Sequence, residues 1–281
     1  MMNSTSEIAQ AYSRDGFVFP YAVTSEENAA TLLADLEAAE TELIDRPNEL
    51  ALLHSYPDRL LPSFDKLIRH PRLLEAAAQL LGPDLMVWSS GLFIKEANTS
   101  SFVSWHQDLT YWGLSDVAEV TAWFSLSHSN MQSGCMRFLP GSHRNQAVPH
   151  IDFFADANLL SRGQEIAHAV NENEAVDVIL KPGEASLHHG HLFHASCPNQ
   201  TNDRRVGAAI RYIKSSMRQT SGEKSLVAQV SGEDPYGNFK IAESPKNRLL
   251  KSDFAMCRED LAIKSRILYD GAKQDGGKRY R

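Results

Sequence analysis

The spacing of hydrophobic and polar residues divides the chain into a helical beginning and a longer region of strands. Apolar residues recur at helical intervals over 25–45, and Thr24 with Glu27 forms a capping-box pattern at the start of that segment. Further helices are expected over 4–14, 64–70 and 71–81, the last ending before Gly82-Pro83, and a strand over 16–20. The stretch 46–63 has no clear period.

From Leu85 onward the pattern changes to short runs rich in β-branched and aromatic residues. Strands are expected over 85–96, 119–127, 135–139, 176–180, 185–188, 191–196 and 205–214. Many short strands after a helical start are typical of a jelly roll with helices on one sheet. We therefore predict a mainly β fold with helices: a double-stranded β-helix (jelly-roll or cupin-like) core with an N-terminal helical layer.

No linker divides the chain, so a single domain is expected over residues 1–281. Its helical N-terminal part reaches to about residue 83, and its β core covers about 84–240, with a further strand near 225–230. The C-terminal part, 241–281, is expected to hold a helix over 246–268 and a tail without order from about residue 276.

Composition and charge exclude several classes of function. The net charge of −7 argues against a nucleic-acid partner or charge-driven binding to acidic lipid. No run approaches the roughly 20 apolar residues of a membrane span, and the polar N-terminus does not resemble a signal peptide. Three cysteines without a Cys-x-x-Cys pair favour a reducing compartment. We expect a cytoplasmic protein that acts on a small molecule; the sequence leaves its oligomeric state open.

The candidate chemistry begins at His106 and Asp108, two residues apart in an aromatic patch. On an extended backbone, residues at this spacing point to the same face. A distant second histidine would complete a two-His-one-carboxylate triad, which holds Fe(II) on one face and leaves positions open. The pair alone is weak evidence, since a polar loop end gives the same pattern.

The second histidine is sought in the run from His188 to His194. If the strands on either side of 198–203 form a hairpin, Ser196 faces Arg205 and His194 lies on the same face. A guanidinium there could pair with a carboxylate through two parallel hydrogen bonds. His188 is an even number of residues from His194 and would point to the same face of a strand, so spacing alone does not exclude it as the ligand.

Three motifs together resemble the phytanoyl-CoA dioxygenase family. They are Trp105-His106-Gln107-Asp108, Phe138-Leu139-Pro140-Gly141-Ser142-His143, and His194-x-Ser196 followed by Arg205. The resemblance runs from about Gly16 to Tyr236. It implies that His106, Asp108 and His194 bind Fe(II), and that Arg205 holds the distal carboxylate of 2-oxoglutarate with help from Ser196.

The resemblance also assigns supporting roles. Trp123 falls in the strand that lines the co-substrate pocket, and Gln107 matches a residue often found between the first two ligands. Lys95, on the strand before the first ligand, could reach 2-oxoglutarate or substrate, or could be a solvated lysine. Tyr111 and Trp112 could line the substrate pocket or belong to the core.

The activity implied is that of an oxidoreductase using Fe(II), 2-oxoglutarate and O2. It would hydroxylate an unactivated carbon of a small metabolite and release succinate and CO2. Asp108 favours hydroxylation over halogenation, because related halogenases bind halide where this carboxylate would stand; desaturation and cyclisation stay open. The alternatives are a jelly-roll metalloenzyme without 2-oxoglutarate and a non-catalytic binding protein. The substrate is not fixed by the sequence.

Overall fold

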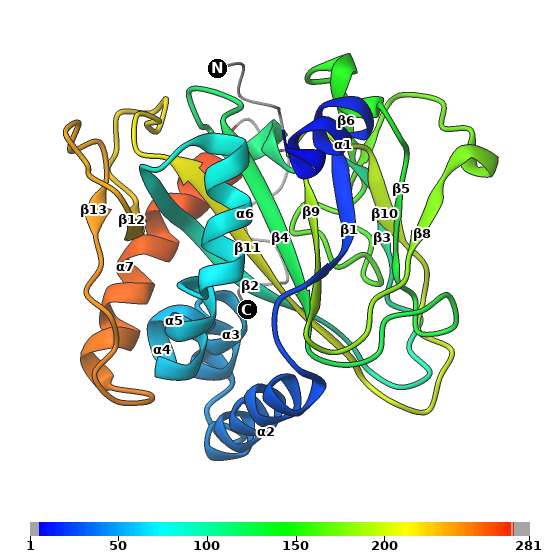
Figure 1. The fold of residues 1–281 in the computed structure, drawn as a ribbon. Helices are drawn as coiled ribbons and strands as arrows, with labels where there is room; N and C mark the ends of the chain where they lie inside the picture. The colour runs from blue at the N-terminus through cyan, green and yellow to red at the C-terminus, as the bar shows by residue number, and fades with distance from the viewer. Residues whose placement is uncertain (1–5, 271, 273–281) are drawn as a thin grey trace.

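Two β-sheets pack against each other, with helices on the outer face of the larger sheet (Figure 1). The computed structural model describes residues 6–270 and 272. The tail expected to lack order, from about residue 276, lies outside these residues. Within the described part, no helix is long and apolar enough to cross a membrane. The cytoplasmic location stays a prediction.

The larger sheet has seven strands. Their order is β1 (Phe17–Ala22), β9 (Glu184–His188), β4 (Glu119–Ser125), β11 (Arg205–Lys214), β2 (Leu85–Lys95), β12 (Leu226–Ser231) and β13 (Lys240–Ile241). Neighbours are antiparallel except β12 and β13. The smaller sheet has the order β3 (Val103–His106), β10 (His194–Ser196), β5 (Met136–Phe138) and β8 (Val176–Val178). Strands β6 (His150–Asp152) and β7 (Gln164–Ile166) form a separate pair. The predicted fold class is confirmed.

Strand β11 is buried on both faces because each face is covered by a different layer. Val206, Ala208, Ile210 and Tyr212 belong to the core shared with the helices. The alternate residues, such as Ala209, face the smaller sheet. A strand covered on both sides lacks polar alternation, and the polar side chains that do occur on its inner face are therefore informative.

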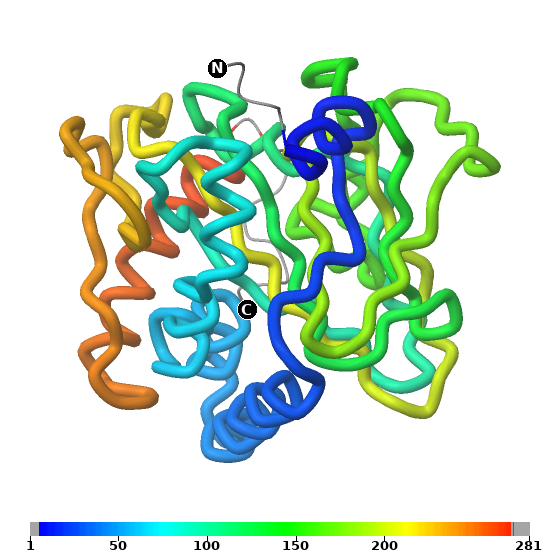
Figure 2. The backbone as a smooth tube through the Cα atoms, viewed as in Figure 1, coloured from blue at the N-terminus to red at the C-terminus, as the bar shows by residue number. Residues whose placement is uncertain are grey.

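Four helices in succession form the covering layer: α3 (Pro47–Ser55), α4 (Pro57–Leu60), α5 (Pro62–Ile68) and α6 (Pro71–Leu81). Each begins at a proline, which fits the first helical position because its missing N–H would have no partner there. The stretch 46–63, which had no clear period in the sequence, therefore consists of short helices that each begin at a proline. The C-terminal helix α7 (Lys251–Leu268) packs beside α3 and α4, as the orange-to-red segment in Figure 2 shows.

Near the N-terminus, α1 (Glu7–Asp15) precedes β1 and α2 (Glu26–Glu42) follows it. The helix α2 is capped by Ser25, whose Oγ accepts from the Asn28 N–H at 3.2 Å. The capping box predicted at Thr24 is therefore wrong by one residue. Three short 3-10 turns complete the helical elements: Leu109–Tyr111, Ser142–Asn145 and Glu172–Glu174.

The hairpin expected between 191–196 and 205–214 is wrong. Strand β10 pairs with β3 and β5 in the smaller sheet, whereas β11 pairs with β2 and β4 in the larger one. The connecting loop crosses between sheets, and the Asn199 amide donates to carbonyl groups of Lys95, Glu96 and Asp203. The pattern of turn residues is the same for a hairpin and for a crossing between facing sheets.

Candidate metal centre and adjoining cavities

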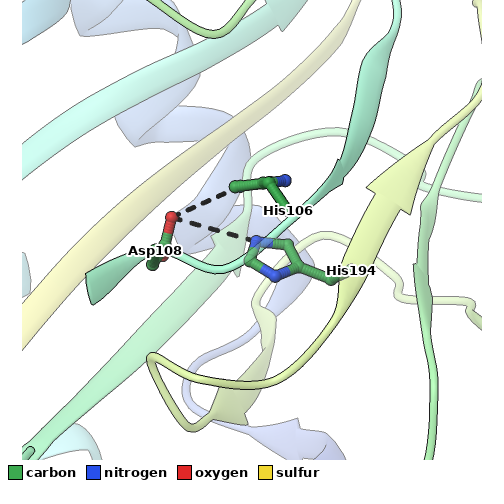
Figure 3. A group of neighbouring side chains, drawn as sticks. All are labelled: His106, Asp108 and His194. Carbon is green, nitrogen blue, oxygen red and sulfur yellow. Dashed lines mark ion pairs between the residues drawn. The ribbon is translucent and has the colours of Figure 1, made fainter. Parts of the chain in front are cut away.

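His106, Asp108 and His194 come together at the inner face of the smaller sheet (Figure 3). One ligand atom from each lies within 4.8 Å of the others. The Nε2 atoms of His106 and His194 are 3.4 Å and 4.0 Å from Oδ1 of Asp108. The two histidines are cross-strand partners in β3 and β10, which places their rings side by side.

The prediction from the sequence places both His106 and Asp108 on extended backbone. For Asp108 this prediction is wrong. Strand β3 ends at His106, and Asp108 has helical dihedral angles (φ −68°, ψ −48°) where a 3-10 turn begins. The turn still carries its carboxylate to the histidines.

Both histidines are oriented by backbone carbonyl groups. Nδ1 of His106 donates to the Ser104 oxygen at 2.9 Å, and Nδ1 of His194 donates to the Leu192 oxygen at 3.0 Å. A carbonyl can only accept, so the proton is on Nδ1 and the Nε2 lone pair is available. Metal-binding histidines are usually held in this way.

The charges of Asp108 and His194 also suit a metal. Burial by itself would raise the pKa of Asp108, but the neighbouring histidines hold that pKa well below its usual value. Burial lowers the pKa of His194 well below its usual value. A carboxylate and neutral imidazoles are the forms that bind a divalent cation.

His188, the alternative ligand, ends β9 in the opposite sheet. Its Nε2 lies 3.8 Å from Oδ2 of Asp108. Neither of its ring nitrogens has a hydrogen-bond partner among the described residues, so its ring lacks the backbone support seen at His106 and His194. The geometry favours His194.

A cavity extends from these residues between the sheets to Arg205. Ser196, Trp123 and Arg205 line it with His106, Asp108 and His194, so the structure brings these six predicted residues together. Arg205 is only 2% exposed, and its Cζ lies 5.1 Å from the Trp123 ring centroid. Burial lowers the pKa of Arg205 to about 10.

Arg205 has no ion pair with any described residue, and its Nε has no hydrogen-bond partner there. Its neighbour Arg204 points the other way and pairs with Glu40 at 3.0 Å. A buried guanidinium is costly without an anion, so this end of the cavity suits a carboxylate. A dicarboxylate chelating a metal at the triad fits both ends.

Lys95 and Gln107 are not among the residues that line this cavity. The Lys95 Nζ atom lies within hydrogen-bond distance of Ser196 Oγ at 2.7 Å, of the Gly134 oxygen at 3.2 Å and of the Cys197 oxygen. Gln107 donates to the His191 oxygen at 2.8 Å and accepts from the Val148 N–H at 2.9 Å. Both side chains support the cavity walls and neighbouring loops.

A second cavity of about 110 Å³ adjoins the first, and both are lined by Phe93, Asp108 and Arg211. Tyr111 and Trp112, the predicted substrate-lining residues, line the second cavity. Sequence reasoning missed most of its other lining residues, among them Trp88, Arg211 and Lys264. Arg211 shares the strand parity of Arg205, which could have revealed it. Lys264 comes from the distant helix α7, and no local pattern points to it.

A double-stranded β-helix with two histidines and a carboxylate between its sheets defines a class of mononuclear non-heme iron proteins. Residues 12–207 match the family described as phytanoyl-CoA dioxygenase (PhyH). The chain belongs to this family, which confirms the resemblance expected from the sequence.

Curated relatives include ectoine dioxygenase of Bordetella parapertussis, 29% identical over 153 residues, half of each chain. A probable alpha-ketoglutarate-dependent hypophosphite dioxygenase of Stutzerimonas stutzeri is 27% identical over 165 residues, 56% of this chain and 54% of that one. Peroxisomal phytanoyl-CoA dioxygenase of Homo sapiens is 28% identical over 148 residues, 50% of this chain and 43% of that one. The chain thus spans about half the length of the curated relatives it matches.

Among solved structures, the non-heme monooxygenase ThoJ without ligand has a TM-score of 0.85 and 32% identity, covering 94% of this chain and 98% of its own. CytC3 with Fe(II) and alpha-ketoglutarate has a TM-score of 0.65 and 21% identity, covering 88% and 96%; it supports the fold alone. The names of the family and of these relatives are those of dioxygenases, one of them alpha-ketoglutarate-dependent, and ThoJ is a non-heme enzyme; they agree with the class of enzyme predicted from the sequence.

Proposed function

We propose that the protein is an Fe(II)- and 2-oxoglutarate-dependent dioxygenase that hydroxylates an unactivated carbon of a small metabolite and releases succinate and CO2. One observation carries the proposal. A single buried cavity joins a two-His-one-carboxylate group to Arg205, which has no acidic partner among the described residues. 2-Oxoglutarate, with a chelating end and a distal carboxylate, matches both ends. We further propose that the chain acts as one catalytic domain.

In this proposal His106, Asp108 and His194 would hold Fe(II). The bound iron supplies the oxidative decarboxylation of 2-oxoglutarate with O2 and the oxidation of the substrate carbon. Arg205 and Ser196 hold the distal carboxylate, and Trp123 packs along the Arg205 guanidinium. Lys95 acts as a positioning residue, because its Nζ atom donates a hydrogen bond to the Ser196 hydroxyl.

Asp108 decides the expected outcome of the reaction. As a metal ligand, its carboxylate would stand where a halogenase would bind halide, so the product should carry a new oxygen atom. Turnover in chloride buffer followed by mass spectrometry checks this expectation. A chlorinated product from the unmodified protein would contradict the assignment of Asp108 as a ligand.

The test of the activity separates the three candidate functions. Binding of 2-oxoglutarate is measured first, anaerobically with Mn(II) in place of Fe(II). Succinate release is then measured with Fe(II), air and a pool of small metabolites, with His194→Ala as the control. A dioxygenase binds 2-oxoglutarate and forms succinate. A metalloenzyme of another kind binds metal without 2-oxoglutarate, and a non-catalytic protein binds 2-oxoglutarate without forming succinate.

A further inference from the structure

Arg211 is a second buried guanidinium on the inner face of β11, three alternate positions beyond Arg205. It is 8% exposed and lines both cavities. Its Nε has no hydrogen-bond partner among the described residues, and Nη1 makes only a long contact of 3.4 Å to Ser89 Oγ. The distal carboxylate of 2-oxoglutarate is assigned to Arg205, so it does not explain why a second buried cation is present.

Aromatic rings fix the Arg211 side chain without neutralising its charge. Its Cζ lies 5.0 Å from the Trp112 ring centroid and 5.9 Å from that of Phe93. Trp112 in turn stacks on Trp88 at 4.9 Å between centroids and an interplanar angle of 28°. A guanidinium held against ring faces keeps its hydrogen-bonding edge available for a planar or tetrahedral oxyanion.

Asp108 and Glu119 interact with Arg211 electrostatically without contacting it as an ion pair. Asp108 is assigned to the metal, and Glu119 Oε1 accepts from the Thr121 hydroxyl at 2.7 Å. Within the described chain, neither forms an ion pair with Arg211. Lys264, the other cation lining the second cavity, is paired with Asp260 at 2.7 Å.

We propose that Arg211 binds an oxyanion of the substrate, such as a carboxylate, sulfonate or phosphonate, while the stacked Trp88 and Trp112 face the apolar body attached to it. The substrate class is therefore a small organic anion with an apolar part. This inference rests on the proposed function, because it assigns the substrate of the same site. Its rival is that Arg211 serves the second carboxylate of 2-oxoglutarate.

The experiment uses benzoate and its neutral counterpart benzamide as probes, with Zn(II) and saturating 2-oxoglutarate bound. The ¹⁵N resonance of the Arg211 Nε–H group, identified by its loss in Arg211→Met, reports binding. Benzoate should shift it saturably, and benzamide should bind at least about ten-fold more weakly, the equivalent of 1.4 kcal/mol. Calorimetry should show that Arg211→Met loses this preference, that Arg211→Lys keeps part of it, and that the exposed Arg218→Met retains it.

Three outcomes would overturn the proposal. The first is equal binding of the two probes, or no shift of the Arg211 resonance with benzoate. The second is a benzoate preference that survives in Arg211→Met, with folding confirmed by circular dichroism. The third is a loss of 2-oxoglutarate affinity of ten-fold or more in Arg211→Met, which would assign Arg211 to the co-substrate.

The same titration without 2-oxoglutarate separates this inference from the proposed function. If the parent protein prefers benzoate but never binds 2-oxoglutarate, the anion site stands and the dioxygenase proposal fails. If the parent binds 2-oxoglutarate and forms succinate but shows no benzoate preference, the dioxygenase stands and the anion site fails.

Discussion

Arg205 and Lys95 are two cations buried side by side, because they are cross-strand partners in β11 and β2. No carboxylate of the described residues pairs with either one. Burial and the neighbouring guanidinium lower the pKa of Lys95 to about 6, so the lysine can release its proton while Arg205 stays charged. The arrangement keeps a single strong positive charge at the end of the cavity.

Replacing Arg205 should disrupt binding of the co-substrate. Truncating one partner of a buried charged pair costs about 2–5 kcal/mol, which corresponds to roughly thirty-fold to several-thousand-fold weaker binding. Arg205→Ala should show such a loss in the 2-oxoglutarate dissociation constant, measured anaerobically with Mn(II). Arg205→Lys should recover only part, because lysine keeps the charge but not the two-pronged geometry.

The matched control is Arg204→Ala, since Arg204 faces away and pairs with Glu40. Its dissociation constant should stay within about three-fold of the parent's, a change of less than 1 kcal/mol. A value for Arg205→Ala within that same range, or a larger loss at Arg204, would remove Arg205 from its assigned role.

Lys95 should make stability depend on pH. Its pKa is about 6 in the folded protein and near 10.5 in the unfolded chain, so the unfolded chain binds one more proton between these values. The free energy of unfolding should therefore rise from pH 6.5 to 8, by at most about 1.4 kcal/mol per pH unit from this group. Urea unfolding of Lys95→Met should show a flatter dependence; an unchanged slope would mean that Lys95 remains charged.

At the scale of the elements, the predicted hairpin was wrong, yet it correctly placed His194, Ser196 and Arg205 around one cavity. The alternation of side chains between the two faces of β11 explains why. The residue parity of Arg205 was correct, and the facing strand β10 delivers Ser196 and His194 from across the sandwich. The alternation of side chains determines which residues share a face of a strand. It does not determine which strands lie beside it, because strand pairing depends on tertiary packing. The strand positions were accordingly predictable and their pairing was not.

Gly207 shows how tightly this element is fitted to the cavity. A Cβ built on Gly207 would lie 1.9 Å from a ring carbon of Trp123, the residue against which Arg205 packs. Gly207→Ala should displace that ring, destabilise the protein by about 1–3 kcal/mol and weaken 2-oxoglutarate binding. Thermal unfolding and the Mn(II) titration measure the two effects. The double variant Gly207→Ala/Trp123→Phe should regain part of the stability, and no recovery would point to a backbone cause instead.

The second cavity, lined by Tyr111 and Trp112, marks the limit of local sequence patterns. Tyr111 and Trp112 follow the first ligand closely in sequence, so their position could be anticipated. Trp88 lies on β2 and Lys264 on α7, and only the folded arrangement brings them to the same wall. Two residues 176 positions apart, joined by the Lys264 ammonium and the Trp88 carbonyl at 2.9 Å, carry no shared periodicity.

For the whole molecule, the two sheets enclose a ligand site in which some buried nitrogen atoms lack hydrogen-bond partners among the described residues. His188 and Arg205 both have buried nitrogens without a hydrogen bond, and the Nε2 atoms of His106 and His194 converge on one carboxylate. Ligands that bind only the folded state stabilise it. Metal and co-substrate should therefore act on global stability as well as on activity.

Mn(II) and 2-oxoglutarate should together raise the unfolding temperature. A ligand at 100 times its dissociation constant adds about 2.7 kcal/mol, which is on the order of 5–10 °C for a chain of this size. His194→Ala should lose the shift from both ligands, since 2-oxoglutarate needs the metal. His188→Ala should begin from a lower unfolding temperature, because it leaves a void in the core, yet should keep the shift. A scan in which His188→Ala loses the shift and His194→Ala retains it would exchange their roles, and the two histidine ligands would then come one from each sheet.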